Sequence, residues 1–97
     1  MKVIGQTEDG IKIVDGVFKM FDSTGLPLDV IFDKCKERNL LPDWIHFYHD
    51  AINQGWQDKT IFNRLDTNIS DVWGREYYHE VKLRLGLYVD RFNLTEQ

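Results

Sequence analysis

The chain has 97 residues, of which 42% are hydrophobic, 13% aromatic and 29% charged, and its formal net charge is −4. A chain of this length buries about 60–70% of the surface that its unfolded form exposes, so we expect a single domain over residues 1–97. The composition excludes collagen, coiled-coil rods and full disorder, and the acidic charge means that nucleic-acid binding would need a local basic patch.

Residues 2–22 predict a small antiparallel β-meander. Ile11 and Ile13 alternate with the intervening lysine, and Asp15-Gly16 separates them from the apolar residues 17–21. An Asp-Gly pair between β-prone segments is a strong hairpin signal, because glycine adopts positive φ without steric cost. A first strand near the N-terminus would join this pair through the turn at Glu8-Asp9-Gly10.

Four helices are predicted after the meander, at about residues 27–39, 42–54, 58–69 and 71–92. Pro27 and Pro42 stand at helix starts, where the missing N–H does no harm. Apolar side chains then recur at steps of three and four residues, as on one face of a helix. Asn39 and Gly55 are suited to left-handed helix ends. The predicted fold class is therefore α+β, a small N-terminal sheet followed by four helices.

The sequence predicts a cytoplasmic protein that does not enter a membrane. The N-terminal segment turns polar at Thr7-Glu8-Asp9, so it lacks the apolar stretch of about 7–15 residues that a secretory signal needs. No apolar run approaches the roughly 20 residues that cross a bilayer. Cys35 is the only cysteine, so no intramolecular disulfide can form.

Aromatic residues are more numerous than a core of this size easily buries. Trp56 follows a glycine that ends a predicted helix, so it lies on a connection, where side chains are often exposed. Trp73 and Tyr77 lie one turn apart beside the apolar stripe of the last predicted helix. The plainer interpretation is that most of these rings belong to the core, with only a polar tip at the surface. Our candidate partner-binding residues are Trp56, Trp73, Tyr77 and Phe62.

These aromatics favour a non-catalytic protein-binding module. Tryptophan and tyrosine dominate the hot spots of protein interfaces, and the surrounding acidic residues suit a basic partner surface. We expect a small regulator or inhibitor that binds a protein partner, such as a phage accessory protein. Surplus apolar surface would also serve a homodimer.

Residues 47–66 resemble the helix-turn-helix of repressor proteins. Ala51 is small where two helices would cross, Gly55 takes the turn, and Ile61 and Leu65 face inward. The resemblance implies, as an alternative function, a dimeric DNA-binding regulator whose second helix enters the major groove. The outward-facing residues of the types that read bases are Gln57, Lys59, Thr60, Asn63 and Arg64.

The same segment departs from the repressor pattern. Asp50 and Gln54 occupy places that are usually apolar, and Trp56 is large where a small aliphatic residue is usual. Residues 43–69 carry four aspartates against one lysine and one arginine, whereas a DNA-binding surface is locally basic. A plain helical hairpin packed on the sheet is the competing interpretation.

Three histidines support a second alternative, a metal-binding or enzymatic protein around His46, His49 and His79. His46 and Asp50 are one turn apart and could share a metal ion. Glu76 and His79 form a Glu-x-x-His pair, of which a di-iron bundle needs two. Solvated helix faces explain the same spacings, and no glycine-rich phosphate loop or Gly-x-Ser-x-Gly motif is present. We therefore predict no metal site, no cofactor and no catalytic residue.

Overall fold

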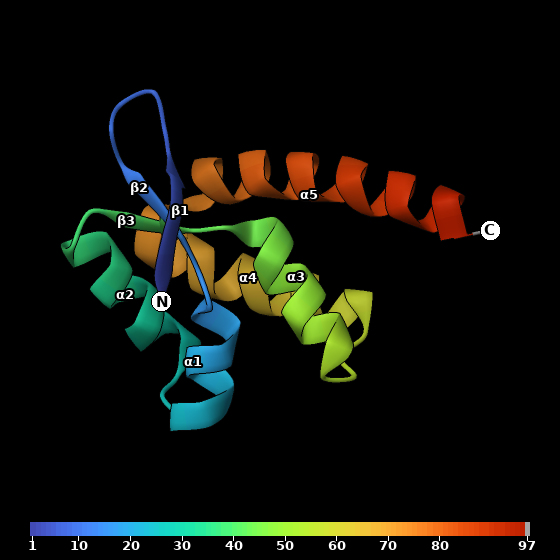
Figure 1. The fold of residues 1–97 in the computed structure, drawn as a ribbon, viewed down its shortest axis with the longest axis horizontal. Coiled ribbons are helices and arrows are strands. Elements are labelled where there is room, and N and C mark those ends of the chain that lie inside the picture. Colours follow the sequence, from blue (N-terminus) through green and yellow to red (C-terminus); the bar gives the residue numbers. More distant parts are fainter. Residues whose placement is uncertain (97) are drawn as a thin grey trace.

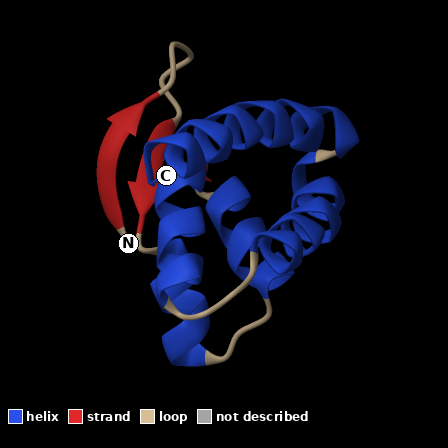
Figure 2. Cartoon of the chain, turned by 90° about the vertical axis from the view of Figure 1, so that its right-hand side faces the viewer, coloured by secondary structure: helices blue, strands red, loops and turns tan. Residues whose placement is uncertain are grey.

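A computed structural model describes the backbone of residues 1–96 and the side chains of residues 1–91. Over this part the fold is α+β, with a three-stranded sheet and five helices. The strands are β1 (Lys2–Gln6), β2 (Lys12–Asp15) and β3 (Leu40–Pro42), and the helices are α1 (Val17–Thr24), α2 (Leu28–Glu37), α3 (Trp44–Asn53), α4 (Asp58–Trp73) and α5 (Arg75–Glu96). Figure 2 shows the sheet at one side of the molecule, with the helices gathered against one of its faces.

The sheet has the order β1-β2-β3. The first two strands pair antiparallel, as the sequence predicted, but β3 pairs parallel to β2. The predicted all-antiparallel meander is therefore wrong in its third strand, which comes from the segment after α2. β1 is exposed along its whole length, and the register shifts between Val3 and Gly5. Such a bulge is common on an edge strand, where it discourages further pairing.

Residues 17–24 form helix α1, where the sequence analysis predicted a strand. Gly16 has φ 81° and begins this helix, instead of forming the turn of a hairpin. Val17 and Phe18 are buried and Phe21 is half-buried, a spacing that puts all three on one face of a helix but on both faces of a strand. Gly25 then ends the helix with φ 72°, and its N–H bonds the Phe21 carbonyl.

The later helices follow the predicted ones with shifted boundaries. α3 begins at Trp44 and not at residue 42, because Pro42 belongs to β3. Asp43 is the N-cap of α3, and its carboxylate accepts a 2.9 Å hydrogen bond from the His46 N–H. The predicted boundary near residues 69–71 is also wrong, because the chain breaks at Gly74, where φ is 99°. This break lengthens α4 to sixteen residues and starts α5 at Arg75.

Buried hydrophobic side chains form one cluster, to which β2 and all five helices contribute. α4 supplies its central row, Ile61, Leu65 and Ile69, each 0% exposed. α4 packs along both α5 and α2, and Figure 1 shows α5 running along one side of the molecule. Among the residues that the structure describes, no helix combines the length and apolar character that crossing a membrane requires.

Candidate binding groove

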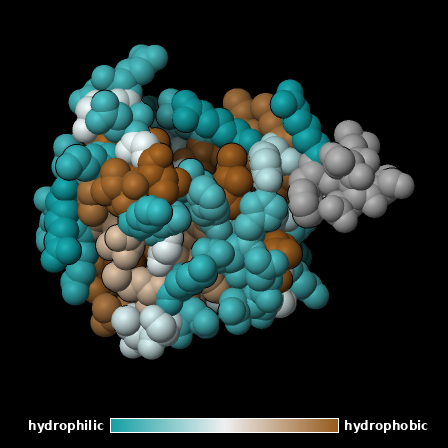
Figure 3. All heavy atoms as spheres, in the orientation of Figure 1, coloured by the Kyte–Doolittle hydropathy of each residue, from teal (hydrophilic) through white to brown (hydrophobic). Residues whose placement is uncertain are grey.

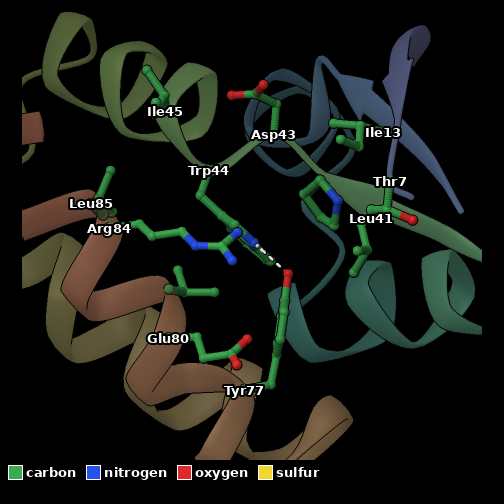
Figure 4. Close-up of a pocket in the computed structure, with 12 residues that line it drawn as sticks. Thr7, Ile13, Leu41, Asp43, Trp44, Ile45, Tyr77, Glu80, Arg84 and Leu85 are labelled. Carbon is green, nitrogen blue, oxygen red and sulfur yellow. Dashed lines mark hydrogen bonds between the residues drawn. The ribbon is translucent and has the colours of Figure 1, made fainter. Parts of the chain in front are cut away.

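A groove lies between the β3 edge of the sheet and α5 (Figure 4). Its floor is apolar and includes Leu41 of β3 and the buried Val81 and Leu85 of α5. Trp44 and Ile45 of α3 also line it, and the volume is about 200 Å³. We call this feature the β3–α5 groove. In Figure 3, hydrophobic side chains reach the surface in the region where Figure 1 places β3 beside the start of α5.

An aromatic cluster holds the wall of the groove in place. The Trp44 indole N–H donates a 2.9 Å hydrogen bond to the Tyr77 hydroxyl, which joins α3 to α5 (Figure 4). The Trp73 ring lies 5.9 Å from the Trp44 ring and 5.8 Å from the Tyr77 ring, between centroids. Phe32 packs edge-on against Trp44 from the core side at 5.3 Å. Such ring contacts stabilise beyond the area they bury, so this wall is largely preformed.

The polar groups of the groove lie at its rim. Burial raises the pKa of Tyr77, so its hydroxyl keeps its proton to a higher pH than that of an exposed tyrosine. This hydroxyl accepts from the indole, and its own proton has no acceptor among the described residues. Glu80 and Arg84 follow on the next turns of α5, and Figure 4 shows Arg84 reaching toward Trp44. Asp43 stands on the opposite wall. The groove thus offers an apolar floor, one phenolic donor and charges of both signs.

The four predicted partner-binding residues fall in different places. Trp73 and Tyr77 belong to the cluster just described, whereas Trp56 lies over α1, with its ring 5.2 Å from that of Phe18. Phe62 lies on α4 and packs against the core. All four side chains are half-buried, so each contributes to packing and also keeps some surface.

Trp56 is also in contact with a residue from the predicted DNA-binding set. The Arg64 guanidinium lies 5.5 Å from the Trp56 ring centre and 5.7 Å from that of Phe21. A cation over an aromatic face gains about 0.5–1 kcal/mol at an exposed site. Arg64 therefore has a structural partner, while the other four residues of that set are exposed on or beside the first turns of α4: Gln57, Lys59, Thr60 and Asn63.

The connection between α3 and α4 has the tight form that the sequence predicted. Gly55 has φ 94°, and its N–H bonds the Ile52 carbonyl at 2.9 Å. The Trp56 N–H reaches back to the Ala51 carbonyl at 3.0 Å, which completes a Schellman motif. The hydroxyl of Tyr48 donates to the Asp58 carboxylate at 2.5 Å and ties α3 to the start of α4.

The three histidines lie in separate surroundings. His46 faces Asp43 at 3.2 Å, and His49 is hydrogen-bonded to the Tyr88 hydroxyl at 2.6 Å. His79 is exposed on α5, nine residues before Tyr88, which is about 13 Å along the helix axis. Within the described residues, no three His, Cys, Asp or Glu side chains come close enough to hold a metal ion.

Trp44, Glu80 and Arg84 line the groove but are not among the site residues that the sequence predicts. They become neighbours because β3 places the start of α3 against α5. A signal was present in Leu40-Leu41-Pro42, an apolar triplet between two helices that is short enough for a strand. The same residues also fit the opening of a helix at Pro42, and that prediction leaves out the sheet edge and the groove beside it.

Comparison with known proteins assigns no family to this chain. No protein-family model matches it, and no solved structure matches it. A short segment is similar to alanine–tRNA ligase from Haemophilus influenzae strains PittGG, Rd and 86-028NP, at 40% identity over 42 residues in each case. This match covers 43% of the chain but only 5% of the length of the ligase. We therefore transfer no activity from the ligase to this chain.

Proposed function

We propose that the chain is a non-catalytic protein-binding module, a small regulator or inhibitor that holds one bulky apolar side chain of a partner in the β3–α5 groove. The observation that carries this proposal is the size and lining of the groove. Its volume of about 200 Å³ lies below the roughly 300–1,000 Å³ of sites for small molecules and cofactors. It is close to that of one large side chain, and pockets for such anchors form the hot spots of protein interfaces.

The rim indicates the chemistry of the partner. The free proton of the Tyr77 hydroxyl can bond a backbone carbonyl beside the anchor. Asp43 and Glu80 favour a positive charge next to it, while Arg84 offers one site for a carboxylate. With a net charge of −4 on the chain, long-range attraction also favours a basic partner surface. We expect the bound segment to carry an aromatic or large aliphatic side chain with lysine or arginine nearby.

The state of the buried thiol and phenol groups favours binding over catalysis. Cys35 is 0% exposed, and burial raises the pKa of its thiol, so the reactive thiolate is disfavoured. Burial also raises the pKa of Tyr48 and Tyr78, whereas an activated nucleophile has a lowered pKa. A lone buried thiol suits a reducing compartment, and we place the module in the cytoplasm.

DNA binding is the second candidate, favoured by the glycine turn at Gly55 and by the exposed polar residues at the start of α4. It would use Gln57, Lys59, Thr60 and Asn63, with Arg64 partly committed to its aromatic neighbours. The acidic balance of residues 43–69 opposes it, because contact with phosphates needs local positive charge.

Two matched variants test the groove. Ile45 is 40% exposed and lines the groove, while Val30 is 37% exposed on α2 and does not line it. Each lies in the first turn of its helix, where an aspartate suits the helix dipole. Ile45→Asp and Val30→Asp should therefore fold alike but differ in binding.

The measurement is quantitative affinity capture with the native host lysate, with and without nuclease. We expect Ile45→Asp to lose the captured protein at least about tenfold, which corresponds to about 1.4 kcal/mol, and Val30→Asp to retain it. Equal capture by both variants would refute the groove as the binding site. Loss of the captured protein on nuclease treatment, together with its loss in a Lys59→Ala, Asn63→Ala variant, would favour DNA binding instead.

A further inference from the structure

Helix α5 has a second apolar surface on the side away from the core. Leu83 is 67% exposed and Leu87 is 59% exposed, more than any other large hydrophobic residue that the structure describes. They lie one turn apart, and at about 100° per residue they are on the face opposite Val81 and Leu85, which are buried. The core does not use this surface, and an exposed apolar stripe on a helix is characteristic of an interaction site.

Gly86 lies between the two leucines. A Cβ added there would meet nothing within 4 Å, so no contact within the chain requires glycine. Glycine in a helix interior costs about 1 kcal/mol relative to alanine. Gly86, Leu83 and Leu87 line a shallow hollow together with Lys82 and Asp90. The absent side chain leaves room for another helix to approach closely.

We propose that this surface, called the α5 stripe and formed by Lys82, Leu83, Gly86, Leu87 and Asp90, pairs with the same stripe of a second copy. The helices run antiparallel, with the two-fold axis passing beside Gly86. A two-fold interface brings one patch against itself, so the patch must be self-complementary. The α5 stripe is self-complementary in three respects: its opposite charges, the spacing of its leucines, and the glycine at its centre.

The charges define the direction of the pairing. Lys82 and Asp90 each lie four residues from Gly86, so the antiparallel arrangement sets each Lys82 at the same height as Asp90 of the second copy. A parallel pair would instead set like charges against each other. Neither side chain makes an ion pair within the described part of the chain, so both are available.

The leucines interleave about the same axis. At a rise of 1.5 Å per residue, Leu87 lies about 1.5 Å on one side of Gly86 and Leu83 about 4.5 Å on the other. Leucines of the two copies therefore alternate along the seam, as ridges pack into grooves. Figures 1 and 2 agree that α5 lies at the periphery. The floor of the β3–α5 groove, at Val81 and Leu85, uses the other side of α5, and this inference does not depend on the proposed function.

Charge reversal tests the pairing without touching the core. Lys82→Glu sets a carboxylate against Asp90 of the second copy, and Asp90→Lys sets two ammonium groups together, so each variant should dissociate. Mixing the two variants restores opposite charges at both contacts of the pair: the two substituted residues face each other at one contact, and the unchanged Asp90 and Lys82 face each other at the other. We therefore expect a heterodimer from two variants that are each monomeric. Sedimentation equilibrium distinguishes one 11.5 kDa chain from a pair of twice that mass, and circular dichroism verifies folding of each variant.

A two-helix contact buries less than a standard interface of about 1,600 Å², so we expect the wild-type dimer to have a dissociation constant of about 10–100 µM. For each single charge-reversal variant we expect a dissociation constant at least about tenfold higher. Leu83→Gln should also yield monomer, while Val30→Asp, on a remote surface, should leave the dimer intact. A monomeric wild-type chain at about 1 mM would overturn the proposal. So would a dimer that both charge reversals leave unchanged, or a mixture of the two variants that stays monomeric.

Discussion

The hydrogen bond from the Trp44 indole to the Tyr77 hydroxyl should contribute measurably to stability. Tyr77→Phe removes the acceptor and leaves the ring in place, so the indole N–H loses its 2.9 Å partner. A net hydrogen bond contributes about 0.5–1.5 kcal/mol, and a stranded donor costs about 1–3 kcal/mol when it is buried. Trp44 is only half-buried, so water compensates in part. We expect a loss of about 1–2 kcal/mol and a fall in Tm of about 4–8 °C per kcal/mol.

A double-mutant cycle isolates this bond from the packing of the two rings. Trp44→Phe removes the donor, and the variant with both substitutions has neither partner. Urea unfolding, followed by circular dichroism, gives the free energy of unfolding of all four proteins. We expect a coupling energy of about 1 kcal/mol, because neighbours that share a bond are not additive. Additivity within about 0.3 kcal/mol would show that the bond does not brace the groove, and our reasoning about its preformed wall would fail.

Three further substitutions or treatments have defined outcomes. Burial, with the hydrogen bond to Asp58, raises the folded-state pKa of Tyr48. The stability from this shift is fully present below about pH 10 and falls above it by about 1.4 kcal/mol per pH unit, because the tyrosine of the unfolded chain ionises first. Tyr48→Phe should reduce this slope in urea titrations at about pH 9–12. Gly74→Ala should cost about 1–3 kcal/mol in thermal unfolding, because φ is 99° there and no neighbour lies within 4 Å to add a clash. Cys35 should react with Ellman's reagent only as the protein opens, since its thiol is buried and burial raises its pKa; rapid labelling of the folded chain would contradict the packing.

Local chemistry made most helices predictable from the sequence. Asn39 has φ 58° and Gly55 has φ 94°, and both were expected at helix ends because each tolerates a left-handed conformation. The start of α4 at Asp58 was also as predicted. These features depend on a few adjacent residues, so tertiary contacts elsewhere in the chain do not change them.

The features that failed depend on distant partners. Asp15-Gly16 favours a hairpin, but the glycine begins α1 because Val17, Phe18 and Phe21 have a common core to fill. Leu40–Pro42 forms a strand only because β2 is there to pair with it. Short apolar segments fit either a helix or a strand, and the decision comes from tertiary contacts that local patterns do not record.

The candidate site failed to appear in the sequence for the same reason. Trp73 and Tyr77 were singled out as adjacent aromatics, yet their meeting with Trp44 requires β3 to turn the chain into α3 beside α5. Trp56 and Arg64 were assigned to competing functions, and the structure places the guanidinium over the indole. A substitution of Arg64 would therefore weaken packing at Trp56 as well as any contact with DNA, so Lys59 and Asn63 are the better probes of DNA binding.

Helix α5 connects the two proposed surfaces. One side contributes Tyr77, Glu80 and Arg84 to the β3–α5 groove, and Leu83 and Leu87 lie on the neighbouring, exposed side, one turn from Glu80 and Arg84. A helix that served only the core would need one apolar stripe, whereas α5 keeps a second one exposed. Because the two surfaces lie on one rigid helix, pairing through the α5 stripe would hold two β3–α5 grooves at a fixed distance from each other. A partner with two anchor segments could then occupy both grooves. Its overall affinity would exceed that of one segment for one groove, because the second binding event is intramolecular and has a high effective concentration. Lys82→Glu, which dissociates the pair, should therefore weaken the binding of such a partner. The same substitution should leave the binding of a peptide with a single anchor unchanged.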